Sequence, residues 1–171
     1  MKIFAGSAAF CVGAIVMQIT AAQAQQRTTA TYEDWTLRCD VRPEPPNQKV
    51  CEIVQSTQMQ GQGALVTQIA IGRPQKGEPL KILLQVPINV WLPTGVRFAY
   101  AEKETPVAAT FKRCLPAACL ADTDLKDDVA RKLRALTENG KLEFKDAAQR
   151  DVAIPVSFKG FAQAFDSLSK E

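Results

Sequence analysis

The sequence of 171 residues contains no histidine, and this absence removes the side chain on which much enzyme chemistry depends. Without histidine there is no Ser-His or Cys-His pair to activate a nucleophile, and the sequence has no G-x-S-x-G elbow. A pair of carboxylates as in glycosidases stays open, because tertiary structure decides whether two carboxylates meet. We therefore expect a protein that is not an enzyme and that holds no cofactor.

The chain also lacks a strong excess of charge of either sign. It has 21 lysines and arginines against 18 aspartates and glutamates, which gives a formal net charge of +3. The basic residues are scattered along the chain, whereas nucleic-acid-binding proteins cluster theirs in a patch or stripe. We expect no nucleic-acid partner.

Long apolar runs are missing except at the start of the sequence. Met1 and Lys2 are followed by apolar, uncharged residues 3–19, and Ala22-Gln23-Ala24 is the small-x-small pattern that signal peptidase reads. We predict a signal peptide over residues 1–24, cleaved after Ala24, and export to the periplasm or the cell surface. A retained membrane anchor is the less favoured alternative, because glycine, serine and glutamine interrupt the apolar run.

After the signal peptide the sequence divides into a short tail and one domain. Residues 25–31 are polar and aperiodic, so we predict a disordered tail there. Residues 32–171 have the length of a single domain, and no stretch within them is long and apolar enough to span a bilayer. No transmembrane span is therefore expected in the exported protein.

Of the five cysteines, Cys11 lies in the predicted signal peptide, and the other four would be exported to an oxidising compartment. An even number there favours disulfides. Cys39 and Cys51 lie in two alternating, strand-like segments, DWTLRCDV and KVCEIVQS, on either side of the proline-rich turn RPEPPNQK. An antiparallel pair of these strands brings the two cysteines opposite each other, within bonding distance. By elimination, Cys114 pairs with Cys119.

The segment FKRCLPAACLADTDL, which holds Cys114 and Cys119, has three possible meanings: a redox couple, half of a metal site, or a structural staple. Redox couples usually have the spacing C-x-x-C at the start of a helix, where the helix terminus lowers the pKa of a thiol. Here the spacing is C-x-x-x-x-C, and the predicted helix begins only after Cys119. A zinc site would need further thiolates or imidazoles. We interpret the pair as a staple, with thiol–disulfide exchange as the alternative.

Apolar residues alternate with polar ones through most of the domain, which is the pattern of half-buried strands. Beyond the two cysteine segments, the pattern covers residues 64–72, 80–86, 96–102, 107–114, 141–144 and 151–158. Glycine- and proline-containing turns separate these runs. So many short strands predict a mainly β domain, a sandwich or a barrel.

Two segments have helical spacing instead. The first apolar stripe consists of Leu125, Val129, Leu133 and Leu136. It predicts an inserted helix capped by Asp122 or Thr123. Residues 157–168, SFKGFAQAFDSL, predict a short amphipathic C-terminal helix with Ser157 as its cap. The aspartates before the first helix lack the D-x-[DN]-x-[DN]-G loop of a calcium site, so we assign them to capping and expect no metal.

Several blocks of the sequence resemble the invasion-associated locus B family of exported bacterial proteins. The most specific are QVPINVWLPTG and RCLPAAC, and the resemblance runs from about Asp34 to Leu168. It implies an immunoglobulin-like β-sandwich with disulfides, in the periplasm or at the surface; the helical spacing described above adds one inserted helix and a short C-terminal helix. The namesake of the family is linked to entry into host cells, and the family offers no catalytic residues to carry over.

The segment VPINVWLPTGV, residues 86–96, is the densest apolar turn of the sequence. Trp91, Leu92 and Pro93 are candidate contacts to a protein partner, since aromatic residues are typical hot spots. Packing of Trp91 as core is the alternative, and we favour it for so continuous an apolar run. We expect the protein to act through protein contacts. The alternatives are a folding helper that uses Cys114 and Cys119, and a small-ligand carrier with an apolar cavity between its sheets.

Overall fold

The computed structural model describes residues 27–42, 48–58 and 65–171, which form ten strands, two α-helices and a short 3₁₀ helix. The strands are β1 (Arg27–Tyr32), β2 (Trp35–Arg42), β3 (Gln48–Gln58), β4 (Leu65–Gly72), β5 (Lys81–Val86), β6 (Val96–Ala99), β7 (Val107–Leu115), β8 (Ala118–Asp124), β9 (Gly140–Lys145) and β10 (Asp151–Val156). The helices are η1 (Leu92–Thr94), α1 (Asp127–Arg134) and α2 (Phe161–Leu168). The prediction of a mainly β protein with two helices is confirmed.

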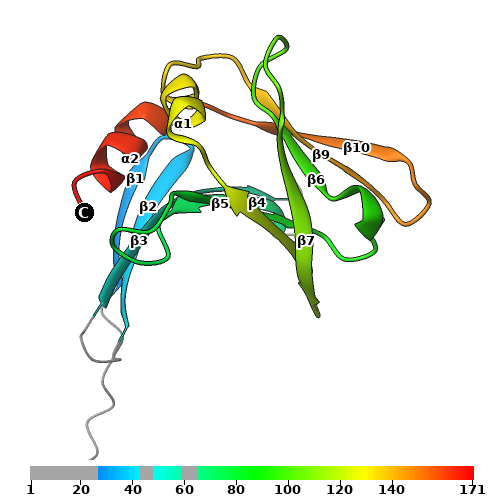
Figure 1. Ribbon diagram of the computed structural model, residues 1–171, viewed down its shortest axis with the longest axis horizontal. Coiled ribbons are helices and arrows are strands. Elements are labelled where there is room, and N and C mark those ends of the chain that lie inside the picture. The colour runs from blue at the N-terminus through cyan, green and yellow to red at the C-terminus, as the bar shows by residue number, and fades with distance from the viewer. Residues whose placement is uncertain (1–26, 43–47, 59–64) are drawn as a thin grey trace, which may run out of the picture.

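The strands form one antiparallel sheet in the order β1-β2-β3-β4-β5-β8-β7-β6-β9-β10, which curls over on itself (Figure 1). The sheet turns at β7, where the first half of the strand, up to Ala109, pairs with β6 and the second half, from Thr110, pairs with β8. The register also shifts between Phe111 and Arg113. A bulge of this kind bends a strand and increases its twist. The two layers expected of a sandwich are thus two arms of one continuous sheet, not two separate sheets.

A row of aromatic rings connects the two arms through the core. Trp35 on β2 contacts Phe161 of α2 edge to face, with 4.9 Å between ring centroids. Phe161 contacts Phe158 at 5.6 Å, and Phe158 reaches Phe98 on β6 at 6.1 Å. Trp35, Phe98 and Phe161 are almost completely buried. Edge-to-face contacts between buried rings add to the hydrophobic stabilisation of the core.

Both helices lie at one end of the molecule, where α2 contacts α1 and the strands β1, β2 and β3 (Figure 1). Of the apolar stripe predicted for this helix, Leu133 on α1 and Leu125 just before it lie in the core, and Val129 and Leu136 pack against the core. The predicted cap of α1 is wrong, because Asp122 and Thr123 belong to β8 and Lys126 precedes the helix without a side-chain cap. Lys81 of the adjacent strand β5 forms ion pairs with Asp122 and Asp124 of β8. These aspartates therefore pair across the sheet instead of capping a helix.

Ser157 is not the cap of α2 either, since Gly160 occupies that position. The backbone of Ser157 is held by other groups: its carbonyl accepts hydrogen bonds from Trp35 Nε1 at 2.8 Å and from Gln55 Nε2 at 2.9 Å. Its N–H donates to Gln55 Oε1 at 2.9 Å. A Cβ on Gly160, where φ is 79°, would lie 1.9 Å from the Tyr32 carbonyl oxygen, so the close approach to β1 requires glycine.

At the N-terminal end, the expected disorder of residues 25–31 is corrected for residues 27–31, which lie in the edge strand β1. β1 pairs with β2 over its whole length, from Arg27 opposite Asp40 to Tyr32 opposite Trp35. The predicted signal peptide and cleavage site lie outside the described residues. Neither described helix has the length and apolar character to cross a bilayer.

Candidate functional site

Residues 87–95, which we call the contact loop, join β5 to β6 and contain the candidate residues Trp91, Leu92 and Pro93. The backbone of this loop is bound to the turn between β9 and β10. The Trp91 N–H donates to the Lys145 carbonyl and the Ala147 N–H donates to the Asn89 carbonyl, both at 2.9 Å. Val90 also forms a β-bridge with Asp146. These bonds give the loop a fixed backbone conformation.

Sequence features at both ends of the contact loop explain its shape. It leaves and re-enters the sheet through Val86 and Val96, both buried in the core. Asn89 has φ of 65°, a left-handed conformation that asparagine tolerates better than most residues. Gly95 has φ of 66°, and a Cβ there would lie 2.4 Å from the Ala109 carbonyl oxygen. Between them, Pro93 lies in the first turn of η1, where its missing N–H is not needed.

The contact loop exposes its apolar side chains. The exposed fractions are 43% for Ile88, 37% for Trp91 and 50% for Leu92, and Pro93 is exposed as well. The interpretation of Trp91 as a core residue, favoured from the sequence, is therefore wrong. Ile88 was not predicted as part of the site, although it belongs to the same apolar run. Four exposed apolar side chains within six residues on a backbone held by hydrogen bonds make this loop a candidate interaction site.

The turn that supports the contact loop is organised by Asp146. Its carboxylate accepts hydrogen bonds from the backbone N–H groups of Ala148 and Arg150 and from the Arg150 side chain, at 2.9, 3.0 and 2.7 Å. The side-chain hydrogen bond from Arg150 is the main reason why the pKa of Asp146 lies below its ordinary value. The turn is therefore fixed by charge-assisted bonds at the point where it holds the loop.

The disulfide between Cys114 and Cys119 closes the β7–β8 hairpin at the other end of β7. The two residues are direct partners in the strand register, with 3.9 Å between their Cα atoms. Cys119 is buried, whereas Cys114 is exposed. The pair lies on two strands rather than at the start of a helix, so the helix terminus that lowers a thiol pKa in redox enzymes is not next to it.

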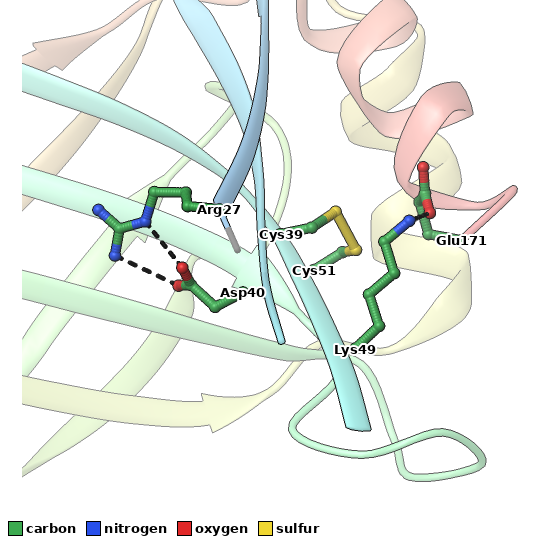
Figure 2. The surroundings of a disulfide bond; sticks show 6 residues. All are labelled: Arg27, Cys39, Asp40, Lys49, Cys51 and Glu171. Atoms are coloured by element: carbon green, nitrogen blue, oxygen red, sulfur yellow. Dashed lines mark hydrogen bonds and ion pairs between the residues drawn. A yellow bond between two sulfur atoms is a disulfide. The ribbon is translucent and has the colours of Figure 1, made fainter. Parts of the chain in front are cut away.

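The disulfide between Cys39 and Cys51 joins β2 to β3, with 4.1 Å between the Cα atoms. Figure 2 shows Lys49 and Glu171, which form an ion pair, beside the sulfur atoms. Cys39, Cys51 and Glu171 are also the one cluster of potential metal ligands in the described part of the chain. Both sulfurs are committed to the disulfide, so the oxidised protein offers no thiolates for a metal at this place.

Carboxylates were the remaining possibility for catalysis. The pKa values of two described carboxyl groups, Asp146 and Asp166, are lowered, chiefly by hydrogen bonds from Arg150 and Arg134 respectively. A general acid in a hydrolase needs a raised pKa instead. These residues thus hold arginines in place rather than providing a proton donor.

A sequence family and a solved structure match this chain. The sequence model described as Invasion associated locus B (IalB) protein matches residues 35–169, which include both disulfides and the contact loop. Among solved structures, the crystal structure of invasion associated protein b from Bartonella henselae is similar in fold. Its TM-score is 0.71 at 21% sequence identity, and the alignment covers 84% of this chain and 95% of that chain. No curated protein sequence matches.

Proposed function

This chain belongs to the invasion associated locus B family, and from that premise we propose that it is an exported, non-enzymatic protein that binds another protein in the periplasm or at the cell surface. The predicted signal peptide and the two disulfides support export, because disulfides form and persist in oxidising compartments. Membership of the invasion associated locus B family, and the similar fold of invasion associated protein b, support a role in contact between bacterium and host cell.

The observation that carries the proposal is the exposure of Trp91 and Leu92 on a loop whose backbone is already fixed. A tryptophan at the centre of an interface often dominates the binding free energy. Because the loop is ordered before a partner arrives, little conformational entropy is lost when the complex forms. The loop therefore has the two properties of an efficient protein-binding site: apolar surface and preorganisation.

The test is site-specific cross-linking in the living bacterium. A photo-reactive amino acid at Leu92 should cross-link to one defined protein, which mass spectrometry then identifies. The matched control is the same amino acid at Leu115, which is also an exposed apolar residue, 47% accessible, but lies on the β7–β8 hairpin. Equal cross-linking from both positions would contradict the proposal.

Affinity measurements with purified protein then give the contribution of Trp91 to binding. Trp91→Ala should weaken binding to the identified partner about 30-fold, the equivalent of a hot spot of about 2 kcal/mol. The bond from the Trp91 N–H to Lys145 belongs to the backbone, so the variant should keep the loop and the stability of the wild type. Unchanged affinity with the fold intact would remove the contact loop from the interface.

The exposure of Cys114 favours a second candidate function, thiol–disulfide exchange with other exported proteins. An attacking thiolate needs access to a sulfur, and the Cys114 side of this bond offers it. The reduction potential of each disulfide, measured by mass spectrometry of thiol-trapped protein across a glutathione series, separates the two functions. A potential below about −300 mV for both bonds identifies them as structural. Opening of only Cys114–Cys119 at the potentials of known oxidoreductases would favour exchange.

A further inference from the structure

A cavity of about 550 Å³, which we call the α2 pocket, lies where α2 meets the start of β3 and the loop between β4 and β5. It is at the opposite end of the molecule from the β9–β10 turn that holds the contact loop (Figure 1). A ligand carrier of this fold would be expected to hold its ligand between the sheets. This pocket lies instead against α2, within the usual size range of small-molecule sites.

The floor of the α2 pocket is apolar. It is formed by Cys51 and Leu80, which are buried, and by Phe165 and Leu168 of α2, which are half-buried. Phe165 stacks on the core residue Phe161 with 5.7 Å between ring centroids, so the floor continues into the hydrophobic core. An apolar chain placed here would remove these side chains from water, which is favourable in proportion to the area buried.

The rim of the α2 pocket is positively charged. Lys49 comes from β3, and Arg73 and Lys76 come from the β4–β5 loop. Arg73 Nη1 donates to the Glu78 carbonyl at 2.6 Å, which orients the guanidinium and leaves its other N–H groups for a ligand. Among the described residues, Glu171 is the carboxylate that forms an ion pair with this rim, and its partner is Lys49 (Figure 2).

We propose that the α2 pocket binds a single-chain amphiphile with a carboxylate head, a ligand of the fatty-acid class. The acyl chain lies on the apolar floor, and the carboxylate is held by Arg73 and Lys76, because a guanidinium fork matches a planar carboxylate. The ion pair of Glu171 with Lys49 places the protein's own carboxylate on the same rim, where it competes with the ligand head for positive charge. This site is independent of the contact loop and extends the function beyond protein binding.

Decanoate is the probe, and its binding to the purified, oxidised protein is followed by isothermal titration calorimetry. We expect a dissociation constant on the order of 100 μM. Lys76→Glu should weaken binding about tenfold, whereas the control Lys103→Glu, the same charge reversal at an exposed residue outside the pocket, should leave it unchanged. Glu171→Gln should tighten binding about threefold, because it frees Lys49 for the ligand.

A second probe distinguishes a carboxylate-specific site from non-specific binding of an apolar chain. Decyltrimethylammonium has the same chain with the opposite charge and should bind at least about tenfold more weakly than decanoate. Equal binding of the two probes, no binding of decanoate at about 1 mM, or no change with Glu171→Gln in a protein that unfolds like wild type would each overturn the proposal. None of these results bears on the contact loop, whose test uses other variants and a protein partner.

Discussion

The hairpins β2–β3 and β7–β8 are each closed by a disulfide bond, but the two bonds lie in different surroundings. In each, the cysteines are direct partners across an antiparallel pair of strands. Cys39 and Cys51 are both buried in the core cluster and are 12 residues apart in the sequence. Cys114 and Cys119 are 5 residues apart, and Cys114 is exposed. One bond is thus covered by the fold, and the other closes a hairpin at the surface.

The surroundings of each bond should matter for stability as well as the length of the loop that it closes. Loop-closure entropy gives about 3 kcal/mol for the longer loop and about 2 kcal/mol for the shorter one. A further difference, of about 1 kcal/mol, comes from the packing of the buried sulfurs beneath α2, which contacts β2 and β3. Four variants, taken from the largest expected effect on stability to the smallest, test this difference, and two further substitutions serve as matched controls.

Removal of the covered bond by Cys39→Ala with Cys51→Ala should lower the free energy of unfolding by about 4 kcal/mol. About 3 kcal/mol is loop entropy, and the rest is the packing of two buried sulfurs. Urea unfolding followed by circular dichroism measures the loss. A loss no greater than that of the equivalent pair of substitutions at Cys114 and Cys119 would contradict the comparison.

Gln55→Ala should loosen the packing of α2 over the Cys39–Cys51 disulfide without changing either cysteine. Gln55 makes two hydrogen bonds to the Ser157 backbone, at 2.9 Å each, in the segment that leads into α2. Their loss in a partly buried place should cost about 2 to 3 kcal/mol. It should also speed the reduction of Cys39–Cys51 by dithiothreitol and leave Cys114–Cys119 unchanged.

Gln68→Ala is the matched control for Gln55→Ala. Gln68 donates to Ser56 Oγ at 2.9 Å on an exposed face of the sheet, so its loss should change stability by less than about 0.5 kcal/mol. It should alter neither reduction rate. Faster reduction of both disulfides in Gln55→Ala would mean general unfolding and would reject the role of α2 as a specific cover.

Cys114→Ala with Cys119→Ala should lower the free energy of unfolding by only about 2 kcal/mol, the loop-closure term alone. The turn at Pro116 and the pairing of β7 with β8 remain to hold the hairpin. Urea unfolding gives the value, and the contact loop should still bind its partner as in the wild type. A protein that no longer folds would show that this bond is needed for the bend of the sheet at β7.

The sequence predicts those parts of the fold that local patterns determine. Ile82, Leu84 and Val86 alternate on β5 and are all buried, as the period of two predicts. The pairing of the cysteines follows from the same alternation and from their even number, and the structure forms the same two disulfides. Local patterns fail where a strand depends on its neighbours. β1 has no apolar alternation and exists because it pairs with β2.

The candidate site was harder to predict than the fold, because periodicity does not determine where a loop side chain points. The apolar run around Trp91 is typical of buried segments, and it indicated core packing. In the structure, the turn at Asn89 and the short helix η1 direct Ile88, Trp91 and Leu92 outward. Asparagine near proline and glycine was the available signal for such a turn. The loop is also held by the turn at Asp146, which is distant in the sequence, so no local sequence pattern could predict this contact.

The smallest effect is expected from Asp166→Asn, which removes the tie between α2 and α1. Arg134 donates to both carboxylate oxygens of Asp166, at 2.6 and 2.7 Å, and this bond is the main cause of a pKa below the ordinary value of 3.8. A lowered pKa means that the pair stabilises the folded protein above the pKa of the unfolded carboxyl and that this stabilisation is lost as the pH falls through the folded pKa. The pair is exposed, so salt should weaken it further.

Urea unfolding of wild type and Asp166→Asn should therefore differ slightly at pH 7 and converge in acid, as the Asp166 carboxyl takes up its proton. At pH 7 dithiothreitol should also reduce the Cys39–Cys51 disulfide of the variant slightly faster, because α2 has lost its ion pair with Arg134. Asp151→Asn removes an ion pair of 2.7 Å with Lys145 on the other arm and should leave that rate unchanged. A stability difference that grows in acid would have the wrong sign for this pair. The cover over the buried disulfide would then rest on the core contacts of α2 alone.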